Sequence, residues 1–167
     1  MRPGSAAWWL AKIRQMKRHI LARVPARERD ALAAWLSPAQ LALFDRMHVA
    51  DRRHGLDVVA ALRAAGERDQ EVLLAGLLHD AGKGDTGMLP RILHSLGQAR
   101  ITWPALALGW LPGLGAALIR LREHADTSAR LAGAAGCSVR TVELIRWQDA
   151  PRDPEAGERL RLADEAN

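Results

Sequence analysis

A histidine followed directly by an aspartate, His79-Asp80, ends a strongly apolar stretch of the sequence that begins near Gln70. Imidazole nitrogens and carboxylate oxygens are common ligands of divalent cations. Burial of such a pair costs several kcal/mol of desolvation free energy unless something compensates both groups, and a divalent cation does so. The dipeptide therefore predicts a metal site at the end of a buried helix.

Two further residues complete a candidate set of ligands. His54 precedes Val58 and Leu62 at helical spacing, so it belongs to the apolar side of an expected helix. Asp164 lies near the end of the sequence, on the same helical line as Leu160. Neutral imidazoles combined with carboxylates suit Mn, Fe, Ni, Co, Mg or Zn and exclude sites built from thiolates.

The order of these residues resembles the HD superfamily of metal-dependent phosphohydrolases, whose pattern is a His, then His-Asp, then a distant Asp. The resemblance covers residues 47–167 and includes Arg53-His54-Gly55, His79-Asp80-Ala81-Gly82-Lys83-Gly84 and Ala163-Asp164. It implies an all-α fold, a compact HD-domain bundle of about six to eight helices. It also implies that His54, His79, Asp80 and Asp164 bind one divalent metal ion. The implied activity is hydrolysis of a phosphate ester, such as a nucleotide or a related small phosphorylated molecule, by a metal-activated water.

Four residues are candidates for catalysis or substrate binding. Asp80 is expected to position the water with its second oxygen. Lys83 lies in a glycine-flanked turn and would contact the phosphate, or it is a solvated lysine at a helix end. His124 lies in a segment that resembles the family segment with a His near the metal, and we expect it to donate a proton or contact phosphate. Arg53 is a further candidate for substrate binding, with Arg52 as an equal competitor.

The sequence favours one metal over two. Family members with two metals have a further pair of histidines, whereas the corresponding region here reads Ile145-Arg146-Trp147-Gln148-Asp149. Asp149 would be the substitute ligand, although its position before Ala150-Pro151 is typical of a loop. His19, His48 and His94 are interpreted as structural or surface residues, with His94 a candidate for the rim of the site.

Length and composition limit the class of protein and its partners. The 167 residues fit one HD domain, with 1–46 as an N-terminal helical extension packed on a core of 47–167. The single cysteine and the lack of a signal-peptide pattern predict a cytoplasmic location. The net charge of +5 points to an anionic partner, but basic and aromatic residues do not interleave. We therefore expect a small phosphorylated substrate rather than nucleic acid, and homo-oligomerisation stays open.

Apolar residues recur at helical spacing throughout, and no strand is expected. The expected helices cover about 6–24, 26–36, 38–47, 51–65, 70–80, 116–135, 138–147 and 153–166. The segment Ile101 to Ile119 has no charged residue and is long enough to span a membrane. Because Pro104, Pro112 and several glycines interrupt it, we expect a pair of short helices instead.

Two other functions stay open beside the hydrolase. One is a metal-binding HD module with a regulatory or scaffolding role and no turnover, which the missing histidine pair allows. The other is docking on a membrane or another subunit through the basic helix around Trp8-Trp9 together with Ile101 to Ile119. Arg, Lys and Trp on one amphipathic helix are typical of interfacial binding.

Overall fold

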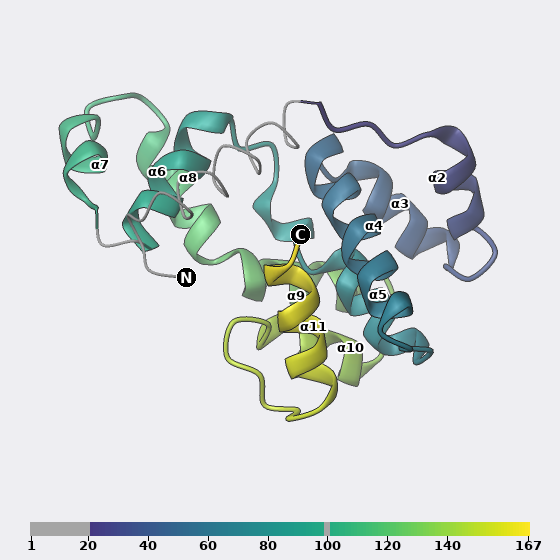
Figure 1. Cartoon of the computed structure of the whole chain (residues 1–167). Helices are drawn as coiled ribbons and strands as arrows, with labels where there is room; N and C mark the ends of the chain where they lie inside the picture. Colours follow the sequence, from purple (N-terminus) through teal and green to yellow (C-terminus); the bar gives the residue numbers. More distant parts are fainter. Residues whose placement is uncertain (1–20, 99–100) are drawn as a thin grey trace.

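The computed structural model describes residues 21–98 and 101–167, which form helices joined by turns, with no strand among them (Figure 1). The helices are α2 (Ala26–Leu32), α3 (Pro38–Arg46), α4 (Val49–Ala64), α5 (Gln70–Leu78), the 3-10 helix η1 (Ala81–Lys83), α6 (Met88–Gln98), α7 (Trp103–Ala107), α8 (Leu114–Arg122), α9 (His124–Ala134), α10 (Val139–Arg146) and α11 (Ala156–Glu165). The all-α prediction is confirmed. The described residues alone form more helices than predicted, because one expected segment is divided and neither α6 nor η1 was expected.

Side-chain caps define several helix starts. Ser37 and Gln40 form the reciprocal capping box of α3, which confirms the start expected at Ser37-Pro38. Ser138 accepts a hydrogen bond from the N–H of Thr141 and caps α10, also as predicted. Asp69 caps α5 in the same way. These local signals fix where the chain enters these three helices.

The first two expected helices end earlier than predicted. Residues 22–25 are not helical, so the helix expected over 6–24 does not reach Val24, and the rest of it lies outside the described residues. Pro25 disfavours helical backbone in the residue before it, which accounts for part of this difference. Helix α2 ends at Leu32 rather than Leu36, and the backbone carbonyl of Trp35 instead accepts a hydrogen bond from Gln70 at 2.8 Å.

The helix expected over 116–135 is divided at Glu123 into α8 and α9. The reason lies in tertiary packing: a Cβ on Gly82 of η1 would overlap the carbonyl oxygen of His124 and lie 2.6 Å from the backbone nitrogen of Ser128. The first turn of α9 therefore lies directly on η1, which a continuation of α8 would not provide. Sequence periodicity does not report a break of this kind.

Helix α5 is the centre of the core. Every residue from Val72 to Leu78 is buried, and the helix packs against α4, α10 and α11. A Cβ on Gly76 would lie 2.9 Å from Leu62 Cδ1 and 3.1 Å from Val58 Cγ1, both on α4. The apolar line of α4 predicted from spacing is thus confirmed, and it lies against α5. Leu43 and Phe44 of α3 belong to the same buried cluster.

The segment from Ile101 to Ile119 forms α7 and the first part of α8, which confirms the predicted pair of short helices. Among the residues that the structure covers, no helix has both the length and the apolar character needed to cross a membrane. Helices α6 and α8 pack on each other, and α6 also contacts α7.

The contact between α4 and α5 at Gly55 should tolerate no larger residue. A Cβ there would overlap the carbonyl oxygen of Leu77, which belongs to the backbone and cannot move aside cheaply. We expect Gly55→Ala to lower the free energy of unfolding by about 1–3 kcal/mol in denaturant titration. The matched control is Gly115→Ala within α8, where nothing lies within 4 Å and alanine should stabilise by about 0.5–1 kcal/mol. Equal effects of the two substitutions would contradict the close contact.

Glu67 fixes the turn between α4 and α5 and should make stability depend on pH. Its Oε1 accepts hydrogen bonds of 2.8 Å from the N–H groups of Arg68 and Asp69, and these bonds lower its pKa from the ordinary value. A carboxylate with a lowered pKa in the folded state stabilises above its unfolded pKa, and this stabilisation is lost as the pH falls through the folded pKa. Glu67→Gln should therefore cost about 1–2 kcal/mol at pH 7 and progressively less below about pH 4.5. A cost that does not change with pH would show that the negative charge contributes nothing.

Candidate metal centre

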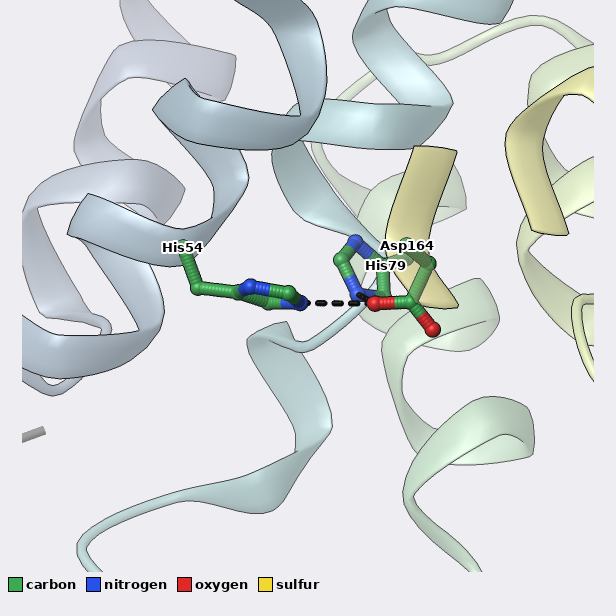
Figure 2. A group of neighbouring side chains, drawn as sticks. All are labelled: His54, His79 and Asp164. Atoms are coloured by element: carbon green, nitrogen blue, oxygen red, sulfur yellow. Dashed lines mark hydrogen bonds and ion pairs between the residues drawn. The ribbon is translucent and has the colours of Figure 1, made fainter. Parts of the chain in front are cut away.

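Three of the four predicted ligands form one tight cluster. His54 on α4, His79 after α5 and Asp164 on α11 place their ligand atoms within 4.8 Å of one another. The Nε2 atoms of His54 and His79 lie 2.7 Å and 3.4 Å from the same oxygen, Asp164 Oδ1. Figure 2 shows both imidazole rings directed at this carboxylate. The structure thus brings together residues from three helices far apart in the sequence, as the motif predicted.

The ring of His79 is held in one orientation by the backbone carbonyl group of Gly76. Helix α5 ends at Leu78, two residues earlier than the predicted Asp80, and His79 is its C-cap residue. The ring Nδ1 lies 2.9 Å from the carbonyl oxygen of Gly76, an atom that can only accept, so Nδ1 carries a proton and Nε2 points at the carboxylates. A hydrogen bond on the second ring nitrogen is the usual way in which proteins orient a metal-binding histidine.

The charges around His79 favour a cation at this place. Burial lowers the pKa of His79, but the carboxylates of Asp80 and Asp164 outweigh it and raise the pKa to about 9. Burial raises the pKa of Asp164, yet its hydrogen bonds to His54 and His79 hold that pKa well below the usual range. The carboxylates therefore keep their negative charge and hold a proton on His79. A divalent cation would compete with that proton for the same nitrogen.

Asp80 has one oxygen without a hydrogen-bond partner, although the residue is only 2 % exposed. This oxygen, Oδ1, lies 3.5 Å from Nε2 of His79 and 3.6 Å from Nε2 of His124. Burial raises the pKa of Asp80, but the positive charges of His79 and Lys83 lower it far more, so the group is ionised. A buried charged oxygen without a partner is costly and calls for an explanation. A cation bound beside the cluster would supply one, so the residues present fit a metal ion.

Lys83 lies against Asp80 rather than in solvent. Its Nζ donates to Asp80 Oδ2 at 2.6 Å, and its side chain is only 25 % exposed. Burial lowers the pKa of Lys83, but the charges of Asp80 and Asp51 more than offset this, and the pKa is raised overall. The interpretation of Lys83 as a solvated residue at a helix end is therefore wrong. The ammonium group fixes the orientation of the Asp80 carboxylate.

His124 opens α9 beside Asp80, and its ring is held at both nitrogens. Nδ1 lies 2.7 Å from the carbonyl oxygen of Leu121, and Nε2 lies 3.0 Å from the side-chain nitrogen of Gln148. Because the Leu121 oxygen only accepts, Nδ1 carries the proton, and Nε2 accepts from the Gln148 amide. Burial lowers the pKa of His124, which favours this neutral form. As arranged here, His124 offers a lone pair rather than a proton.

Gln148 is a residue of the site that the sequence interpretation passed over. It is 6 % exposed, and its Oε1 has no hydrogen-bond partner. A half-turn of the amide would place Oε1 against His124 Nε2, so Gln148 can serve either protonation state of the imidazole. The available signal was its position in the segment where two-metal family members carry histidines.

Two further contacts hold the elements of the site together. Ser128 Oγ accepts a hydrogen bond of 2.7 Å from the N–H of Gly82, which fixes η1 on α9. Asp51 at the start of α4 accepts two hydrogen bonds of 2.7 Å from Arg91 on α6. Asp51 is 4 % exposed, so this ion pair is nearly buried, and its charges act on Lys83. Neither contact could be read from residue types in one segment.

The remaining candidates lie apart from the cluster. Arg53 binds Glu28 at 2.6 Å and Asp57 at 3.1 Å, so its guanidinium already has two carboxylate partners, and its role in substrate binding stays a prediction. Arg52 has a buried Nε without a partner. His94 is close enough to His124 and Lys83 that their charges, after burial, lower its pKa. Within the described ranges, no second group of three or more metal-binding residues is found.

The chain was compared with protein-family models, with curated proteins and with solved structures, and none of these comparisons gives a match. Membership of the HD superfamily therefore stays a prediction from the motif residues. What the structure adds is the geometry of the cluster itself.

The cluster should bind one divalent ion through Asp164. In calorimetric titration with Mn²⁺ or Zn²⁺, we expect one site per chain in the wild type. Asp164→Asn should weaken binding by at least about tenfold, because it removes a charged ligand. Glu165→Gln, one residue further along α11 and exposed, is the matched control and should bind as the wild type does. Equal affinities of the two variants would exclude Asp164 as a ligand.

Proposed function

We propose that the protein is a metal-dependent phosphohydrolase acting on a phosphate ester, with nucleotides and related small phosphorylated molecules as the substrate class. The observation that carries this proposal is the buried Oδ1 of Asp80, which has no hydrogen bond and faces two imidazoles beside the cluster of His54, His79 and Asp164. A divalent cation at this place would satisfy that oxygen and interact with both carboxylates. The substrate class rests on the resemblance to the HD superfamily.

The metal ligands would be His54, His79, Asp80 and Asp164. When bound there, a divalent ion supplies Lewis acidity and lowers the pKa of a water molecule. Asp80 is oriented for this task, because Lys83 holds Oδ2 and leaves Oδ1 facing the imidazoles. Hydrogen bonds of this kind to a ligating carboxylate are part of how proteins tune metal sites.

Lys83 and His124 would flank a phosphate bound beside Asp80. The ammonium of Lys83 is the cation next to Asp80, and it would offset the charge that develops on phosphoryl oxygens. The Nε2 lone pair of His124 accepts a hydrogen bond from Gln148, so His124 could accept a proton from water only after that amide turns away. The role of proton donor, expected from the sequence, would require His124 to be protonated first, and burial opposes that.

A metal-binding module without turnover is the second candidate, and one observation favours it. Both cations expected to meet the substrate already have carboxylate partners, since Lys83 binds Asp80 and Arg53 binds Glu28 and Asp57. A regulatory module would retain the metal without needing a free cation for phosphate. The predicted cytoplasmic location suits either candidate.

Bound-metal content and hydrolysis separate the two candidates. The wild type, Asp80→Asn and Lys83→Met are expressed with added metal, analysed by mass spectrometry and assayed on nucleotides, phosphomonoesters and phosphodiesters. We expect Asp80→Asn to lose both metal and activity. Lys83→Met should keep the metal and lose about 100-fold in kcat/KM, because the charge on phosphate is no longer offset.

The control is Asp85→Asn, an exposed carboxylate in the loop that follows η1, which should behave as the wild type. Metal in the wild type without hydrolysis of any ester would favour the regulatory module. Equal, near-zero metal content in the wild type and Asp80→Asn would exclude both candidates.

A further inference from the structure

Helices α6, α7 and α8 form a distinct part of the molecule, which we term the α6–α8 lobe. Helix α6 packs against both α7 and α8, and α8 reaches the rest of the structure through η1 and α9. In Figure 1, α7 lies at one end of the molecule and α2 at the opposite end. The outer end of the lobe is therefore remote from the core around α5.

The α6–α8 lobe exposes an unusual amount of apolar surface. Six of the nine large apolar side chains that are exposed in the described residues belong to it: Leu89, Ile92, Trp103, Leu106, Trp110 and Ile119. The three most exposed, Trp103 at 70 %, Leu106 at 78 % and Trp110 at 76 %, come from one short segment. Trp103 and Leu106 also share one side of α7 because they are three residues apart. Exposed apolar side chains gathered in this way indicate an interaction surface.

Basic and acidic residues are distributed unevenly along the chain, and the α6–α8 lobe is basic. From Thr86 to Arg122 there is no Asp or Glu, but there are four arginines, and residues 1–20 have five basic and no acidic residues. The whole chain has 24 basic and 19 acidic residues. Residues 21–85 and 123–167 together therefore carry 15 basic and 19 acidic residues and are net negative. Within the lobe, Arg91 is neutralised by Asp51, whereas Arg120 and Arg122 are exposed. An anionic partner that also accepts apolar side chains suits this combination best.

The charge and the apolar character of the α6–α8 lobe together decide which kind of partner suits it. A second α6–α8 lobe or the segment 1–20 would meet the lobe with like charge. A nucleic acid would match the charge, but Leu106 and Ile119 have no ring to stack on bases. The interface of an anionic bilayer accepts tryptophan and aliphatic side chains beside acidic headgroups.

We propose that the α6–α8 lobe docks on anionic lipid bilayers. Trp103, Leu106 and Trp110 enter the headgroup region, and Arg120 and Arg122 contact the acidic headgroups. The inference is independent of the proposed hydrolase activity, because none of these residues belongs to the metal cluster.

The test is co-sedimentation of the full chain with lipid vesicles. The vesicles contain phosphatidylcholine alone or with about 30 mol% phosphatidylserine, at about 0.05 M and about 0.5 M NaCl. We expect at least about tenfold tighter binding to the anionic vesicles at low salt, and weaker binding at high salt. The double variant Trp103→Ala/Trp110→Ala should weaken this binding by at least about tenfold. Arg120→Glu/Arg122→Glu should have a similar effect, together with a weaker dependence on salt.

Matched controls carry the same chemical changes elsewhere. Val139→Ala removes an apolar side chain that is 81 % exposed on α10. Arg27→Glu/Arg46→Glu reverses two exposed arginines on α2 and α3. Both controls should bind within about twofold of the wild type, because they lie outside the lobe. Circular dichroism is used to check that all variants keep the helical fold.

Three results would overturn the proposal. The first is no binding of the wild type to anionic vesicles at low salt. The second is wild-type binding by Trp103→Ala/Trp110→Ala, which would assign the lipid contact to another part of the chain. The third is an interaction of another kind in a protein that does not bind vesicles. This would be a dimer in sedimentation, or tight binding to single-stranded nucleic acid, that is lost in Trp103→Ala/Trp110→Ala.

Discussion

The close crossing of α4 and α5 is the constraint on which the rest of the structure depends. At Gly55 the backbone of α4 touches the carbonyl of Leu77, and at Gly76 the backbone of α5 meets the side chains of α4. Such an approach is open only to residues without a Cβ. His54 adjoins the first of these contacts and His79 follows the helix end, so the same crossing that closes the core also sets the separation of the two imidazoles.

The charged groups of the site depend on one another in turn. Asp80 is tolerated at 2 % exposure because Lys83 and two imidazoles surround it, and Asp164 because two imidazoles share its Oδ1. These contacts compensate the carboxylates only in part, since Asp80 Oδ1 keeps no hydrogen bond. Removal of one member leaves buried charge without a partner, which costs more than the contact itself contributes. The site is therefore a single electrostatic unit rather than a set of independent pairs.

The sequence predicted those parts of the structure that local chemistry determines. Helical spacing placed His54 with Val58 and Leu62, and Asp164 with Leu160, and the structure has both lines facing the core. The division at Glu123, the contact of Gln148 with His124 and the Asp51–Arg91 ion pair were not foreseen. Each of them depends on how separate segments meet, and a pattern within one segment does not contain that information.

The break between α8 and α9 at Glu123 lies between the basic α6–α8 lobe and the net negative rest of the described chain. Helix α8 belongs to the basic lobe, and α9 begins one residue after Glu123 with His124 at the site. For the anionic substrate of the proposed reaction, the net negative remainder of the chain is repulsive, and the basic lobe is attractive. Lys83 lies on η1, the element that contacts both α8 and α9. The basic lobe would therefore attract a phosphate toward η1, where Lys83 is the cation beside Asp80.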